Sequence, residues 1–92
     1  MLLDDEYTQA DHDFRENDAY AGAKYDITLR WLGNGAGRPL LNVGCGGGLF
    51  NTLAADHGFS VEACEPDPTA FAVAEQHRPD GVVVHRAGLF DV

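Results

Sequence analysis

The centre of the chain reads Leu40-Leu41-Asn42-Val43-Gly44-Cys45-Gly46-Gly47-Gly48-Leu49-Phe50-Asn51. The apolar part of this run is too short for a buried helix and is bounded by Pro39 and Gly44, which predicts a short parallel strand. The glycines that follow allow the backbone to turn sharply and to approach a ligand closely. We therefore predict a ligand-binding loop between a strand and a helix.

The glycine spacing narrows the choice of ligand. A dinucleotide-binding loop has glycines at its first, third and sixth places, but the sixth place counted from Gly44 is Leu49, where close packing of helix on strand requires Gly or Ala. A nucleoside triphosphate loop has Gly-Lys followed by Ser or Thr, and no lysine stands near this loop. The spacing Gly44-x-Gly46-x-Gly48 therefore disfavours both NAD and nucleoside triphosphates.

An acidic residue follows the next predicted strand. Residues 59–64 have partial apolar alternation, and Glu65-Pro66-Asp67 comes directly after them. Glu65 follows Gly44 at about the 20-residue offset at which an acidic side chain after a second strand reaches the hydroxyls of a ribose. The loop and the carboxylate together favour a ligand that contains a ribose.

The segment from Leu41 to Gly48 resembles the first motif of the class I S-adenosylmethionine (SAM) dependent methyltransferases, whose usual form is apolar, acidic, apolar, Gly-Cys-Gly-x-Gly. The resemblance extends over about Tyr20 to Val92, the cofactor-binding half of that fold. It implies that the loop runs beside the methionine part of SAM and that Glu65 accepts hydrogen bonds from its ribose. The residues expected to contact the cofactor are Asn42, Gly44, Cys45, Gly46, Gly48, Glu65, Pro66 and Leu89.

Two positions depart from the pattern of that family. Asn42 stands where the family usually has an acidic residue, so a negative charge near the sulfonium end of the cofactor is lost. Gly88 stands where an acidic residue holds the adenine amino group; Leu89 can still pack on the ring, and Asp91 can replace the acid only if the loop is shifted. We expect a reduced affinity for SAM. No residue is assigned as catalytic, because the strand that supplies those groups in the family would follow Val92.

Charge and composition limit the partners. The chain has 92 residues and a net charge of −9, from 15 acidic and 6 basic residues. An acidic surface repels a phosphate backbone, because nucleic-acid affinity depends on Lys and Arg that displace counterions. We expect no nucleic-acid partner and a small-molecule methyl acceptor. The chain has neither a signal-like start nor about 18 consecutive apolar residues, so a cytoplasmic protein without a membrane partner is expected.

The cysteines and histidines do not suggest a metal site. Cys45 and Cys64 form no CxxC pair, and the four histidines have no ligand spacing with them. Both cysteines should lie near the carboxyl ends of adjacent strands. Small apolar fillers that stay reduced are the favoured interpretation, and a redox pair is the alternative.

Two helices can be outlined on either side of the first strand. A helix capped by Asn17 or Asp18 should run to about Leu32 and turn one apolar face to the sheet. A second helix should run from about residue 49 to His57, whose ring favours the negative end of the helix dipole. The residues predicted for the inward face of the first helix are Tyr20, Ala23, Ile27 and Trp31. In the second, Leu49, Leu53 and Ala54 should face the sheet, and Asn51 and Thr52 should not. Tyr20 or Tyr25 either touches the cofactor or, as favoured, packs in the core.

The remaining elements complete the order strand, helix, strand, helix, strand. Asp67 should cap a helix with Pro68 in its first turn, and this helix should turn Phe71 and Ala74 to the core. Residues 82–85, Val-Val-Val-His, form a third strand. The predicted fold class is α/β, a Rossmann-like parallel sheet of about three strands preceded by an N-terminal helix. We expect residues 1–18, which hold seven of the acidic residues, to be an acidic arm, and residues 19–92 to be a partial SAM-binding domain.

A seven-stranded methyltransferase needs more residues than this chain has. Three parallel strands with one uncovered face leave an apolar edge, here at residues 82–84, which natural proteins avoid. We expect an incomplete methyltransferase fold that either associates with itself or pairs with a complementing C-terminal half, and that is inactive alone. The alternative to the SAM-binding portion of a methyltransferase is a non-catalytic binding or assembly module.

Overall fold

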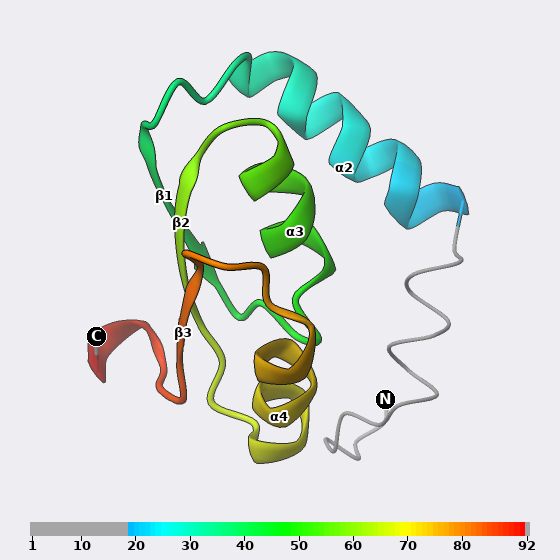
Figure 1. The fold of residues 1–92 in the computed structure, drawn as a ribbon. Helices are drawn as coiled ribbons and strands as arrows, with labels where there is room; N and C mark the ends of the chain where they lie inside the picture. Colours follow the sequence, from blue (N-terminus) through cyan, green and yellow to red (C-terminus); the bar gives the residue numbers. More distant parts are fainter. Residues whose placement is uncertain (1–18, 92) are drawn as a thin grey trace.

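The computed structural model describes residues 19–91 (Figure 1). Over these residues the chain is an α/β protein with three α-helices and a parallel three-stranded sheet, as predicted. The predicted acidic arm lies outside the described residues. The elements, in chain order, are α2 (Ala19–Leu32), β1 (Pro39–Val43), α3 (Leu49–Asp56), β2 (Ser60–Cys64), α4 (Pro68–His77), β3 (Val83–His85) and the short 3-10 helix η1 (Leu89–Asp91).

The sheet has the order β1-β2-β3, and both neighbouring pairs are parallel. Val43 lies beside Cys64, and Cys64 lies beside His85, so the three strands end at one edge. Each parallel pair requires a crossover, and α3 and α4 provide the two crossovers. The arrangement is a partial Rossmann-like fold, with the loops that follow β1 and β2 side by side.

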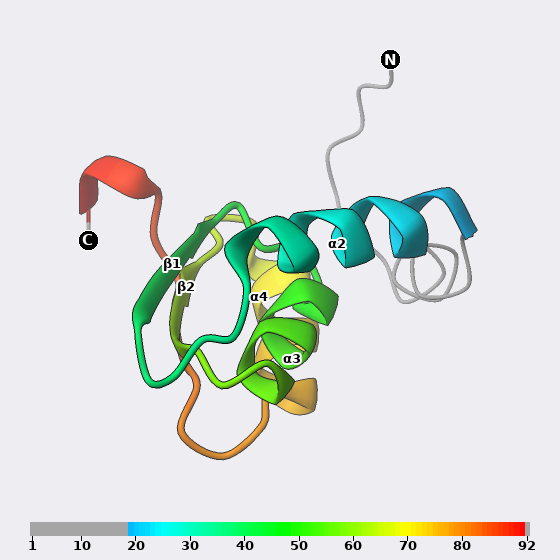
Figure 2. The same cartoon turned by 90° about the horizontal axis from the view of Figure 1, so that it is seen from above.

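The core lies on one face of the sheet. Val61, Ala63 and Val84 are buried there against Ala54 of α3 and Ala74 of α4. Figures 1 and 2 show α3 and α4 on this side, with α2 running across the outside of α3. On the opposite face Leu41, Val43 and Val83 remain about half exposed. Parallel sheets are almost always covered on both faces, so this face lacks a layer within residues 19–91.

The predicted inward face of α2 is wrong. Ile27 is 45% exposed and Trp31 is 84% exposed, whereas Leu29 is buried and Tyr25 is half-buried. The ring of Tyr25 packs against that of Phe50 in α3, with 5.2 Å between their centroids. Both faces of this helix carry apolar residues four positions apart, so spacing alone does not select between them. The side chain of Tyr20 lies outside the described part.

The connection after α2 holds the helix in this rotation. The guanidinium of Arg38 donates to the carbonyls of Leu32 and Asn34, at 2.6 and 2.8 Å, and lies over the ring of Phe59. The N–H of Gly35 donates to the carbonyl of His57 at 2.7 Å. At Gly35 a Cβ would lie 2.4 Å from the backbone nitrogen of Phe59, so only glycine allows this approach. The end of α2 is therefore fastened to the start of β2.

The helix before β3 forms as predicted. Asp67 is its N-cap and accepts the N–H of Ala70 at 2.8 Å, and Pro68 occupies the first helical position. Ala74 is buried and Phe71 packs against the core. Glu65, two residues before this cap, accepts the N–H of Gly46 in the glycine loop.

Candidate functional site

The glycine loop begins where β1 ends. The N–H groups of Gly44 and Cys45 both donate to the carbonyl of Cys64, at 2.9 and 3.1 Å, so the loop stays against the end of β2. The φ angles of Gly44, Gly46 and Gly48 are 67°, 59° and 91°, in the left-handed region that side chains disfavour. The predicted loop is therefore present, and its last glycine, Gly48, is the N-cap of α3.

Glu65 is joined to this loop by a direct hydrogen bond. The residue is 8% exposed; its Oε1 accepts the N–H of Gly46 at 2.8 Å, and its Oε2 accepts the N–H of Asp67 at 3.0 Å. The glycine loop and Glu65, about 20 residues apart in the sequence, are therefore in contact at the edge of the sheet. A carboxylate offers about four lone-pair sites, so two remain for a ligand.

A pocket of about 200 Å³ opens between the glycine loop and α2. Three predicted site residues line it, namely Asn42, Gly44 and Cys45. The other lining residues are Lys24, Tyr25, Thr28 and Phe50. Tyr25 therefore both packs on Phe50 and lines the pocket. Sequence reasoning missed Lys24, Thr28 and Phe50; Lys24 is the only lysine of the chain, which was the available signal.

A pair of asparagines supports the floor of this pocket. Asn42 Nδ2 donates to Asn51 Oδ1 at 2.8 Å, which leaves the side-chain oxygen Oδ1 of Asn42 and the second N–H of its Nδ2 for a ligand. Asn51 is 1% exposed, and the expectation that it faces away from the sheet is wrong. Asn51 is buried because it bonds to Asn42, nine residues earlier on β1. The periodicity of α3 alone cannot predict a bond to another element. Within the described chain Asn51 Nδ2 has no hydrogen-bond partner.

The two cysteines lie at the same edge and are free thiols. Burial raises the pKa of the Cys45 thiol; the nearby amide of Asn51 opposes this rise, and the charges of Glu65 and Cys64 add to it. The thiol is therefore neutral at pH 7, which does not suit a nucleophile. Cys64 is fully buried, as expected for an apolar filler.

Gly48, Pro66 and Leu89 are the remaining predicted residues. Gly48 is buried, and a Cβ there would lie 3.3 Å from the Cβ of Ala74, so it allows α3 and α4 to pack closely. Pro66 is exposed beside Glu65. Leu89 is about half exposed on η1 and does not line the pocket. Asp91 Oδ2 accepts the N–H of Gly88 at 3.1 Å, so this carboxylate closes its own turn.

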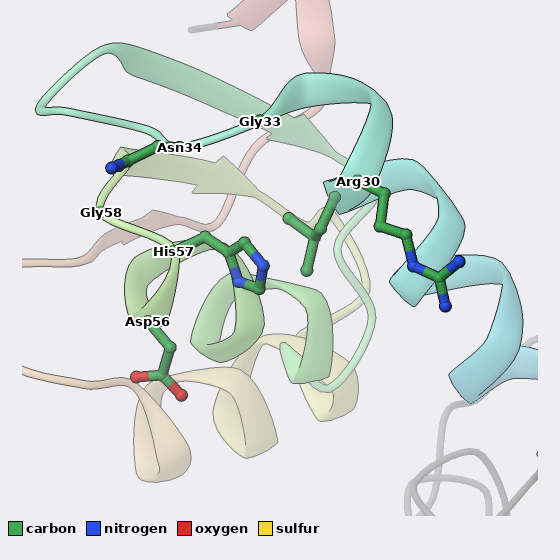
Figure 3. A pocket seen from close by; sticks show the side chains of 7 residues that line it. Arg30, Gly33, Asn34, Asp56, His57 and Gly58 are labelled. Carbon is green, nitrogen blue, oxygen red and sulfur yellow. The ribbon is translucent and has the colours of Figure 1, made fainter.

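A larger hollow, of about 520 Å³, lies at the opposite end of the sheet beside α2 and the end of α3 (Figure 3). The figure shows the guanidinium of Arg30 and the carboxylate of Asp56 pointing in different directions, away from the ring of His57. The Nδ1 atom of His57 lies 3.2 Å from the carbonyl oxygen of Leu53, at the end of α3. This hollow lacks converging polar groups, so we place the site at the glycine loop.

Neither a metal site nor a spanning helix is found in residues 19–91. No three of their His, Cys, Asp and Glu side chains are grouped in a way that could hold a metal ion. None of their helices has the length and apolar character needed to cross a membrane.

Comparison with known proteins gives a limited match. Over 42 residues, 46% of this chain, it is 40% identical to a protein of Schizosaccharomyces pombe named "Ubiquinone biosynthesis O-methyltransferase, mitochondrial". The match spans 15% of that protein's length. No family model matches the chain, and no solved structure matches it. The match supports similarity to a methyltransferase over this stretch.

Proposed function

We propose that this chain is the SAM-binding portion of a methyltransferase that transfers a methyl group from SAM to a small molecule. The proposal rests on one observation: the N–H of Gly46 in the glycine loop donates a hydrogen bond to Glu65 Oε1 at 2.8 Å. A strand-end carboxylate beside a glycine loop is the arrangement expected for a ligand with a ribose. The similarity to an O-methyltransferase supports SAM over other ribose-containing ligands.

The polar groups of the site suit the parts of SAM. The carboxylate of Glu65 suits the ribose hydroxyls, because it can accept two hydrogen bonds beyond those from Gly46 and Asp67. In the pocket, the ammonium group of Lys24 can bind a carboxylate, and the side-chain oxygen of Asn42 can accept a hydrogen bond from an ammonium group. These are the two charged groups of the methionine part. When bound, SAM would supply the electrophilic methyl group.

The methyl acceptor and the partner belong to the same proposal. The name of the relative supports an oxygen atom of a small molecule as acceptor. The uncovered face with Leu41, Val43 and Val83 supports a need for further polypeptide, supplied by a complementing C-terminal half or by another copy. The chain alone would then bind without transferring methyl groups. We propose a cytoplasmic location, although the relative's name includes "mitochondrial".

A non-catalytic module is the second candidate, and one observation favours it. Both oxygens of Glu65 already accept backbone N–H groups of this chain, so the carboxylate would have a purpose without any ligand. In that case the glycine loop only connects β1 to α3, and the pocket beside α2 binds no ligand.

Isothermal titration calorimetry separates the two candidates. The chain is titrated with SAM, S-adenosylhomocysteine and NAD; we expect heat of binding with the first two and none with NAD. Gly46→Val should abolish binding with secondary structure retained by circular dichroism, because a β-branched residue resists φ 59°. Glu62→Ala is the control that should bind normally. Glu62 lies on β2, the strand before Glu65, and its carboxylate pairs with His85. Absence of binding by the folded parent chain would refute the proposal.

A further inference from the structure

The outer surface of α2 carries an apolar stripe formed by Ala23, Ile27 and Trp31. These residues are four positions apart, so they lie on one side of the helix, opposite Tyr25 and Leu29. All three are exposed, and Trp31 is 84% exposed. Tryptophan is highly buried on average in folded proteins and is enriched at the centre of protein interfaces. The stripe therefore needs an explanation outside the core.

The core does not use this stripe. Leu29 belongs to the core cluster, and Tyr25 contacts Phe50, so the inner side of α2 already has its partners. Figure 2 shows α2 lying across the outside of α3, with its far side turned away from the sheet. As far as residues 19–91 show, the stripe is uncovered and is therefore available to a second molecule.

The charges beside the stripe are arranged for self-pairing. Asp26 and Arg30 form an exposed ion pair along one flank of the stripe. In an antiparallel pairing of two α2 helices centred on Ile27, Asp26 would lie within one turn of the partner's Arg30. The small Ala23 would lie opposite the partner's bulky Trp31. Size and charge are therefore both complementary when the stripe meets its own copy.

We propose that two copies of this chain associate through antiparallel packing of the α2 stripe. The contact joins two single helices, so the interface is small and we expect a weak dimer. This inference does not depend on SAM binding and can fail or succeed separately.

Trp31 reports this contact directly, because it is the only tryptophan in the chain. Its fluorescence and its quenching by acrylamide are measured over a concentration series, beside sedimentation velocity on the same samples. We expect solvent-exposed emission at low concentration. A blue shift and reduced quenching should then follow the sedimentation isotherm to a dimer.

Variants identify the surface. Ile27→Glu should weaken association at least tenfold, whereas Val83→Glu, on the uncovered sheet face, should not. Asp26→Arg and Arg30→Asp should each associate more weakly than the parent, and an equimolar mixture of the two should recover association, because each then meets the opposite charge. Circular dichroism checks that all four remain helical.

Three results would overturn the inference. The first is a monomer with exposed Trp31 emission at hundreds of micromolar. The second is Trp31 emission that is already blue-shifted and independent of concentration, which would mean that the chain's own residues cover the stripe. The third is a dimer that Val83→Glu disrupts and Ile27→Glu does not.

Discussion

The hydrogen bonds of Glu65 give the sharpest test of how the loop edge is held together. Glu65→Gln keeps the size of the side chain but removes the charge and one acceptor, so an amide N–H would face the N–H of Gly46 or of Asp67. Glu65 is buried, at 8% exposure of the residue, so water cannot easily replace the lost bond. A hydrogen bond to a charged group contributes about 1.5–3 kcal/mol, and we expect a loss of about 2 kcal/mol in the free energy of unfolding.

Urea unfolding followed by circular dichroism measures this loss. With a slope of about 1 kcal/mol per M, the midpoint of Glu65→Gln should fall by about 2 M. Glu62→Gln is the matched control, because Glu62 lies on β2, three residues before Glu65, and its half-exposed carboxylate pairs with His85. An exposed pair is worth about 0.2–1 kcal/mol, so the midpoint of the control should move by less than about 1 M.

A second measurement locates the effect. In amide hydrogen exchange the Gly46 N–H should be protected in the parent and should exchange faster in Glu65→Gln. Equal urea midpoints for the two variants, together with unchanged exchange at Gly46, would show that the bond between Glu65 and Gly46 does not hold the loop.

Three further outcomes are expected. Gly35→Ala should destabilise the fold by about 1–3 kcal/mol, since its Cβ would lie 2.4 Å from a backbone nitrogen, whereas Gly22→Ala, which meets no atom within 4 Å, should stabilise α2 by about 0.5–1 kcal/mol; urea midpoints that move together would contradict this. Asp67→Ala should cost about 1 kcal/mol of stability by removing the cap of α4, and an unchanged thermal midpoint would argue against that cap. Iodoacetamide should alkylate Cys45 more slowly than a free cysteine at pH 8.5, because its raised pKa leaves less thiolate at that pH; a rate equal to that of the free amino acid would contradict the burial of the thiol.

Local sequence was sufficient for the order of the elements. The short apolar runs bounded by glycine and proline predict the three strands, and they form at about the predicted positions. Asp67 and Pro68 predict the start of α4, because a cap depends only on groups within three residues. The positive φ angles of Gly44 and Gly46 are likewise a local property, because glycine has no Cβ to oppose them.

The tertiary structure decided which side chains face inward. Ala23, Ile27 and Trp31 have the same spacing as Tyr25 and Leu29, and only the contact with Phe50 and the fastening by Arg38 turn Leu29 toward the core. The burial of Asn51 requires Asn42 on β1, and the place of Lys24 in the pocket requires α2 to lie over the glycine loop. Periodicity describes the faces of one helix, whereas burial depends on which neighbours the chain brings to each face from distant parts of the sequence.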